Sequence, residues 1–265
     1  MEQLKWEATL ERKCRLANIL YLSVYNAMLL TTLREHGQDE VAQLKWKIMR
    51  SHQRKHFLPG LKKLGLENEA TDAISSSKYH YFSNMLGGME AQYMEETPEK
   101  VWVRYPAPYP LSDSPFTPSV AAAAFSAAYG QATYSAWYAF NGKSLGNPRL
   151  GFVLTQSIHQ GDPYSAGYFK IYDHDLESDE TLQVSPAERP PRFDPATAPK
   201  LPLDEWTEER KARAMRNYAV EYVNSAVAAL LAKYGIGGTR SIVQHAYQIT
   251  MAQRSRQLIE DLQIA

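Results

Sequence analysis

The chain has 265 residues, enough for one large domain or two small ones with a substantial core. Its hydrophobic fraction of 44% and charged fraction of 22% are those of an ordinary globular protein, and its formal net charge is zero. A nucleic-acid-binding protein normally carries a basic excess, so this balance argues against that class. The single cysteine, Cys14, excludes an intramolecular disulfide and any metal site built from several cysteines.

The N-terminal sequence Met-Glu-Gln-Leu-Lys-Trp has no apolar signal core, and no uninterrupted run approaches the roughly 18 apolar residues of a membrane helix. We therefore expect a cytoplasmic protein with neither a membrane nor a nucleic acid as partner. The 17 tyrosines and five tryptophans exceed what a minimal core requires. Tyrosine buries a large ring and keeps a hydroxyl for hydrogen bonding, so such clusters suit pockets and interfaces as well as helix packing.

Helical periodicity dominates the first hundred residues. Residues 3–36 form a predicted amphipathic helix that ends near Gly37, a natural C-cap. A second helix starts at Asp39 and stops before Pro59, and a third is expected over residues 70–96 with an interruption at two glycines. The second helix has a basic side that we expect to be solvated, made of Lys45, Lys47, Arg50, Arg54 and Lys55.

Residues 101–105 alternate as a strand, which places Arg104 on the Trp102 face. After a proline-rich connection, Thr117 and Pro118 are typical of a helix N-terminus, and the helix is expected to continue to residue 140. Its many small residues indicate a central, tightly packed position. Its two aromatic and polar stripes either line a pocket or pack in the core, namely Tyr129, Thr133 and Trp137, and Gln131, Tyr134 and Tyr138.

Residues 150–173 predict a β-hairpin, because two runs rich in β-branched and aromatic residues flank a polar turn. Together with residues 101–105, the hairpin makes a small antiparallel sheet of three or more strands. The fold class is therefore α+β, mainly helical, with a C-terminal helical hairpin that is broken at Gly235. We expect residues 1–175 to form the helical and small-sheet core, residues 176–206 a proline-rich arm or loop, and residues 207–265 the helical hairpin packed on that core.

Known chemical signatures are scarce. The sequence has no Gly-x-Ser-x-Gly, no Gly-x-Gly-x-x-Gly and no phosphate loop, so a nucleophile elbow and a nucleotide cofactor have no support. Pairing around the turn places His159 opposite about Ser165, and His174 lies about nine strand residues further along. At about 3.3 Å per residue this separation is roughly 30 Å, which is too far for the two histidines to share a metal ion. We therefore predict no metal and no cofactor.

The turn of the hairpin holds the densest set of chemically capable side chains. His159 titrates near neutrality and is the candidate acid–base group, with Asp162 as its partner and Tyr164 as a proton donor. The alternative for Asp162 is a purely structural bond to backbone amides of the Gly-Asp-Pro turn. Arg104 is the candidate carboxylate anchor, because guanidinium suits bidentate recognition. The remaining candidate substrate-binding residues are Tyr134, Trp137, Gln160 and Tyr168.

Two short segments carry a family resemblance, namely Thr155-Gln156-Ser157-Ile158-His159-Gln160-Gly161-Asp162-Pro163-Tyr164 and Gly167-Tyr168-Phe169. Together with the order of elements, they resemble the L-2-amino-thiazoline-4-carboxylic acid hydrolase-like family. The resemblance covers about residues 10–175. It implies hydrolysis of a non-peptide carbon–nitrogen bond in a small cyclic amidine or imine. The family's typical segment continues with a His-Cys pair, and the corresponding positions near Pro163, Tyr164 and Ser165 hold neither residue type.

Three functions follow as hypotheses. The first is an enzyme that uses the site given above to act by acid–base chemistry on a small polar or heterocyclic molecule. The second is a non-catalytic small-molecule-binding module that uses the same aromatic pocket. The third is a helical assembly subunit, in which the 176–206 segment and terminal helices bury surface between chains of a homo-oligomer.

Overall fold

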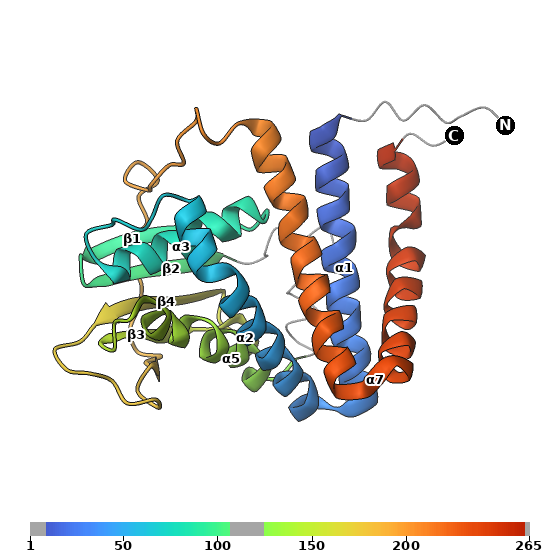
Figure 1. The fold of residues 1–265 in the computed structure, drawn as a ribbon, viewed down its shortest axis with the longest axis horizontal. Helices are drawn as coiled ribbons and strands as arrows, with labels where there is room; N and C mark the ends of the chain where they lie inside the picture. Colours follow the sequence, from blue (N-terminus) through green and yellow to red (C-terminus); the bar gives the residue numbers. More distant parts are fainter. Residues whose placement is uncertain (1–8, 107–124, 263–265) are drawn as a thin grey trace.

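The computed structural model describes residues 9–106 and 125–262, and its architecture is α+β and mainly helical, as predicted (Figure 1). The helices of the first part are α1 (Leu10–His36), α2 (Gln38–Lys63) and α3 (Asp72–Leu86). They are followed by the strands β1 (Gln92–Thr97) and β2 (Lys100–Pro106). The second part contains α5 (Ala127–Ala136), η2 (Tyr138–Phe140), α6 (Asn141–Leu145), β3 (Leu150–Gln156), η3 (Ile158–Gln160), β4 (Tyr164–Ile171), β5 (Leu182–Val184) and α7 (Glu208–Leu262).

The sheet has five strands in the order β1-β2-β4-β3-β5. The predicted hairpin is confirmed, because β3 and β4 pair in antiparallel register with Phe152 opposite Phe169. Strand β2 pairs antiparallel with the other side of β4, as the predicted three-stranded sheet requires. Strand β5 pairs in parallel with β3 and lies inside the segment that was predicted to be only an arm or loop. That segment therefore returns to the sheet.

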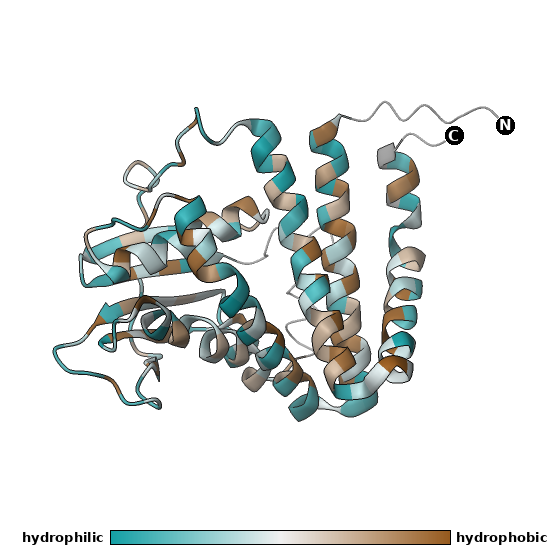
Figure 2. Ribbon diagram, in the orientation of Figure 1, coloured by the Kyte–Doolittle hydropathy of each residue, from teal (hydrophilic) through white to brown (hydrophobic). Residues whose placement is uncertain are grey.

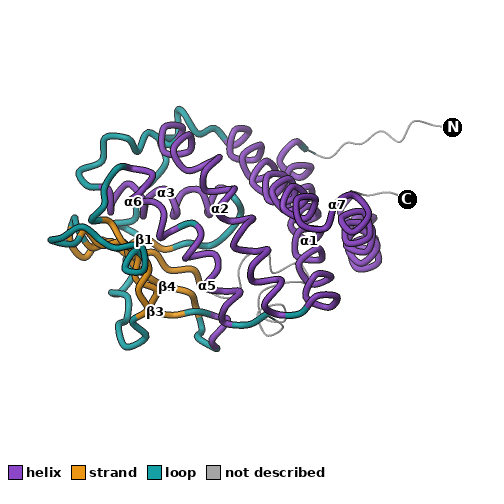
Figure 3. Tube along the Cα trace, turned by 60° about the horizontal axis from the view of Figure 1, so that its bottom comes forward, coloured by secondary structure: helices purple, strands orange, loops and turns teal. Residues whose placement is uncertain are grey.

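The two faces of the sheet have different partners. Val103, Phe152 and Phe169 belong to the main core, on the face that the helices cover (Figure 3). Trp102 and Tyr168 belong to a smaller cluster on the opposite face. The sheet therefore separates side chains that are neighbours in sequence into two environments.

The predicted third helix over residues 70–96 is wrong in its second half. Helix α3 ends at Leu86, the chain turns at Gly88 with a φ of +87°, and strand β1 follows. Tyr93 pairs with Val103 of β2 and is buried, so tertiary pairing prevails over the helical pattern. The predicted helix start at Thr117 and Pro118 lies outside the described residues. Helix α5 begins after Ser126, whose Oγ accepts a hydrogen bond from a backbone N–H of the first turn.

Helix α1 lies between the two arms of α7 (Figure 1). The arms meet at Gly235, which has a non-helical backbone with a φ of +64°, so the predicted break of the C-terminal hairpin is confirmed. At the upper end of this bundle, Asn18 Nδ2 donates to the carbonyl oxygens of Gly87 and Met215 at 3.2 and 2.7 Å. One buried amide thus joins α1, the end of α3 and the first arm of α7.

Helix α1 is long and apolar enough to span a membrane by length and composition, with a mean hydropathy of 1.4 over its best 18-residue window. The apolar residues along it are visible in Figure 2. The sequence criterion of an uninterrupted apolar run missed this helix, because polar residues such as Asn18 interrupt the window. In the folded protein 61% of the window is buried, mainly against α7 and α2, which is the position of a core helix.

Candidate functional site

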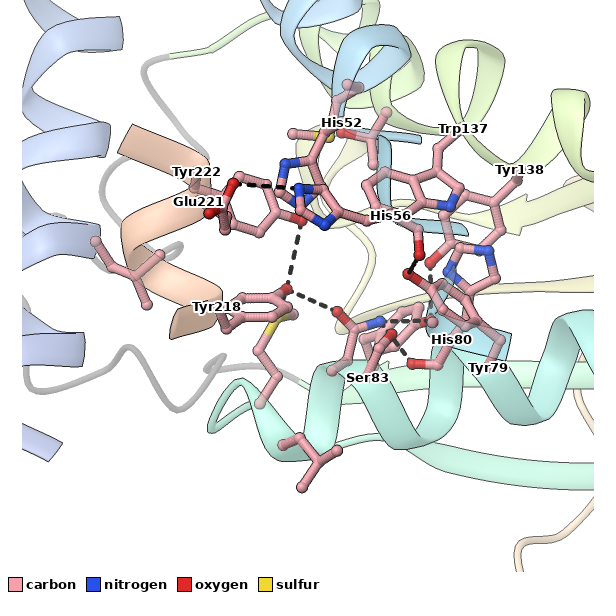
Figure 4. Close-up of a pocket in the computed structure, with 18 of the residues that line it drawn as sticks. His52, His56, Tyr79, His80, Ser83, Trp137, Tyr138, Tyr218, Glu221 and Tyr222 are labelled. Carbon is pink, nitrogen blue, oxygen red and sulfur yellow. Dashed lines mark hydrogen bonds and ion pairs between the residues drawn. The ribbon is translucent and has the colours of Figure 1, made fainter. Parts of the chain in front are cut away.

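A cavity of about 440 Å³ lies between α1, α2, α3, α5 and the first arm of α7. Figure 4 shows its centre, where side chains of α7 face those of α2 and α3 across the open space. The wall is dominated by aromatic rings and imidazoles. Its tyrosines include Tyr25, Tyr79, Tyr129, Tyr138, Tyr218 and Tyr222.

A chain of hydrogen bonds runs along one side of the cavity. Tyr138 and Tyr105 share a bond of 2.8 Å between their hydroxyls, Asn84 Nδ2 donates to Tyr105 at 3.1 Å, and Tyr218 donates to Asn84 Oδ1 at 2.8 Å. Burial raises the pKa of Tyr138 and of Tyr218 well above the ordinary value. These phenols therefore stay protonated at neutral pH and act as hydrogen-bonding groups.

Two histidines of α2 face the first arm of α7, with ring centroids 4.3 Å apart. His52 Nδ1 lies 3.0 Å from the hydroxyl of Ser225, and its ring stacks on Tyr222 at 4.5 Å. His56 Nε2 lies 3.3 Å from a carboxylate oxygen of Glu221, at ion-pair distance but without the alignment of a hydrogen bond.

Burial is the main cause of the lowered pKa of both histidines. For His52, the neighbouring His56 and nearby lysines lower the pKa further, well below the usual value. For His56, the carboxylate of Glu221 opposes the effect of burial without cancelling it. Both imidazoles are neutral at pH 7, so each has one nitrogen that accepts a proton.

His80 of α3 is packed among aromatic rings. Its ring stacks on Tyr138 at 3.8 Å, and its Nε2 lies 3.0 Å from Asn141 Nδ2. Burial lowers its pKa well below the usual value. His80 therefore forms a neutral and largely fixed part of the cavity wall.

Lys45 is an exception to the predicted solvated basic face of α2, on which Lys47, Arg54 and Lys55 are exposed. Its Nζ donates to the hydroxyl of Tyr25 at 2.8 Å and lies 5.3 Å from the ring centroid of Tyr129. No carboxylate of the described residues lies within ion-pair distance of it. Desolvation lowers the pKa of Lys45 to about 7, whereas its neighbour Lys47 is exposed.

Trp137 supplies a further polar atom, for which the described part of the chain provides no partner. The residue is 6% exposed and lines the cavity, and its Nε1 has no acceptor among the described residues. A buried indole N–H usually finds an acceptor. Trp137 therefore offers a hydrogen bond that a bound molecule can accept.

Three of the predicted site residues are on the cavity wall: His159, Tyr134 and Trp137. His159 lies in η3 with its ring edge-on to Tyr129, at a centroid distance of 5.4 Å. It approaches α5 closely because Gly130 has no side chain; a Cβ there would lie 2.5 Å from the imidazole. The absence of a side chain at Gly130 thus lets the hairpin turn pack against the predicted pocket stripe of α5.

The other residues of the turn do not line the cavity. Asp162 Oδ2 accepts a hydrogen bond from the backbone N–H of Ser157 at 2.9 Å, which is the structural alternative for this carboxylate. Gln160 is exposed, and Tyr164 lies at the start of β4 with its ring 5.3 Å from the guanidinium carbon of Arg104. The predicted grouping of Asp162, Tyr164 and His159 around one substrate is therefore not found.

Arg104 and Tyr168 are also away from the cavity. Arg104 Nε donates to Gln92 Oε1 at 2.6 Å, and the Tyr168 hydroxyl donates to Glu188 Oε1 at 2.8 Å. Tyr168 belongs to the cluster on the far face of the sheet, and Arg104 shares that face by alternation along β2. The sheet thus stands between these two residues and the aromatic residues of α5.

The sequence analysis missed the contributions of α2 and α7 to the cavity, namely Lys45, His52, His56, Glu221 and Tyr222. For α2 a signal was available, since residues 45, 49, 52 and 56 recur at spacings of three and four and define one helix face. For α7 there was none, because nothing local relates residues near 222 to residues near 52.

Among the described residues no group of three or more His, Cys, Asp or Glu side chains is arranged to hold a metal ion. The candidate site is therefore an aromatic cavity with four imidazoles, the amines of Lys45 and Lys63, and one carboxylate on its wall. No family model, no curated protein and no solved structure matches the chain.

Proposed function

We propose that the protein binds a small, planar, polar molecule in the cavity between α2, α3, α5 and α7, and acts on it by acid–base chemistry. The observation that carries the proposal is a cavity with an aromatic wall and a polar atom, Trp137 Nε1, that has no hydrogen-bond partner among the described residues. A volume of about 440 Å³ falls within the range of small-molecule sites. Flat aromatic walls favour a ligand that stacks.

His52 is the proposed acid–base group. Its Nδ1 is engaged by Ser225, which fixes the orientation of the ring and leaves Nε2 as the nitrogen for a ligand. Its neutral state makes it a base at pH 7. His159, on the opposite side near Tyr129, is the second imidazole that such a ligand can reach.

The reaction proposed within this framework is hydrolysis of a carbon–nitrogen bond in a cyclic amidine or imine, the chemistry that the family resemblance of the hairpin implies. A neutral imidazole removes a proton from water as the water attacks the amidine carbon. A protonated phenol of the wall donates to the departing nitrogen and recovers its proton from the imidazolium, a role open to Tyr222 beside His52. No thiol is required in this scheme.

The experiment measures binding and turnover separately. Benzamidine and 2-amino-thiazoline-4-carboxylate are added to the purified protein, with the melting temperature followed by fluorescence and the products by liquid chromatography. We expect both compounds to raise the melting temperature. We also expect His52→Gln to lower turnover at least ten-fold with a smaller change in binding.

Tyr168→Phe is the matched control, because it removes a hydroxyl on the far face of the sheet and should change neither readout. Ligand recovered unchanged, with the melting temperature raised, would leave the non-catalytic binding module as the function. No thermal shift with any planar amidine would refute the proposed cavity.

A further inference from the structure

The further inference concerns Lys45 and rests on the proposed function. We propose that the cavity takes ligands with an aldehyde or ketone group and that Lys45 Nζ condenses with this carbonyl to form an imine. The argument begins with the position of the amine, which lines the cavity from α2 among the rings of α1 and α5. A lysine placed for charge alone would normally have an acidic partner, and the described residues supply none within ion-pair distance.

The groups around the amine provide no opposite charge to stabilise its protonated form. Tyr25 faces it from α1 and Tyr129 from α5, with Tyr222 of α7 behind both and His52 further along α2. Burial raises the pKa of these phenols and lowers the pKa of the imidazole, so all of them are uncharged at pH 7. An amine in such surroundings keeps its nucleophilic lone pair near neutral pH.

The hydrogen bond to Tyr25 also suits the chemistry. Nζ donates one proton to the phenolic oxygen at 2.8 Å, which leaves the lone pair of the neutral amine directed elsewhere. The lone pair adds to the carbonyl carbon, and a C–N bond forms. The Tyr25 hydroxyl can accept a proton from nitrogen while it gives its own to the former carbonyl oxygen.

Loss of that oxygen as water completes the imine. Both hydrogens of the neutral amine leave in the water, and the C=O bond is exchanged for a C=N bond. No oxidant, reductant or metal takes part. The flat aromatic walls favour a carbonyl conjugated to a planar ring, since such a ligand stacks while its carbonyl carbon meets Nζ.

The test uses the full-length protein and 2-naphthaldehyde, with sodium borohydride to reduce any imine to a stable secondary amine. Peptide mass spectrometry then compares labelling at Lys45 with labelling at Lys47, the exposed lysine of the same helix. At pH 7 about half of Lys45 is neutral, whereas about one in 2,500 molecules of an ordinary lysine is neutral. We expect at least ten-fold more label at Lys45 at pH 7 and a smaller ratio at pH 10.

A parallel measurement with 2-naphthalenemethanol, which has the same ring but no carbonyl, separates this inference from the proposed function. If the alcohol raises the melting temperature and Lys45 is labelled no more than Lys47, imine formation is refuted and the cavity remains the proposed binding site. If neither compound shifts the melting temperature and Lys45 is unlabelled, both proposals fail. Lys45→Met should lose the extra stabilisation by the aldehyde and keep that by the alcohol.

Discussion

Replacing Lys45 with methionine should stabilise the protein in a strongly pH-dependent way. The amine has a pKa of about 7 in the folded protein, against about 10.4 in an unfolded chain. Between these values the unfolded state binds the extra proton, so the stability of the wild-type protein rises with pH across this window and is lower at pH 7. Protonation of this lysine alone favours unfolding by about 3 kcal/mol more at pH 7 than at pH 9.5.

The variant lacks this group, so its stability advantage over the wild type should shrink by about 3 kcal/mol between pH 7 and pH 9.5. Urea unfolding followed by tryptophan fluorescence at pH 7, 8 and 9.5 measures the difference, and buried tyrosines cancel because both proteins contain them. Lys47→Met is the control, since an exposed lysine on the same helix should show no such trend. If the stability advantage of Lys45→Met were constant across these pH values, the lowered pKa of an amine without a carboxylate partner would be refuted.

Three further predictions concern stability and ligand binding. Gly167→Ala should lower the free energy of unfolding by about 2 kcal/mol or more, because its Cβ would lie 2.4 Å from a backbone oxygen of β3. In Gly237→Ala the new Cβ meets nothing within 4 Å, so this variant should raise the free energy of unfolding by about 0.5 kcal/mol. Chemical denaturation measures both changes. The free energy of unfolding should fall as the pH drops below about 6.5, because His52 and His80 bind protons in the unfolded state but stay neutral in the folded protein. Urea titrations of His52→Gln should show a weaker dependence of stability on pH in this range. Trp137→Phe removes an N–H without an acceptor and should leave thermal stability within about 1 kcal/mol while weakening ligand binding.

Much of the fold followed from periodicity. The two runs rich in β-branched and aromatic residues within residues 150–173 predicted the hairpin that β3 and β4 form. Gly235 marked the break of the C-terminal helices, because a positive φ there suits glycine. Strand β1 was missed since its pattern after Gly88 is short and ambiguous, and pairing with β2 decided its conformation.

The candidate site was predictable only where its residues lie close in sequence or on a recognised stripe. Tyr134 and Trp137 were found because a helix places residues three and four apart on one side. Lys45 was misassigned because charge alone does not distinguish a solvated amine from one that faces an internal cavity. Glu221 and Tyr222 were missed because their contacts with His56 and His52 join residues about 165 to 170 positions apart in the sequence.

The enclosure of α1 by α7 has a consequence for synthesis of the protein. Helix α1 begins at Leu10 and the first arm that covers it begins at Glu208. At the usual 5–20 residues per second, roughly 10–40 seconds pass between the translation of these two residues. During this interval α1, with its mean hydropathy of 1.4, has no helix of α7 to cover it. The nascent chain therefore presents a hydrophobic helix to chaperones until the last fifth of the sequence has been made.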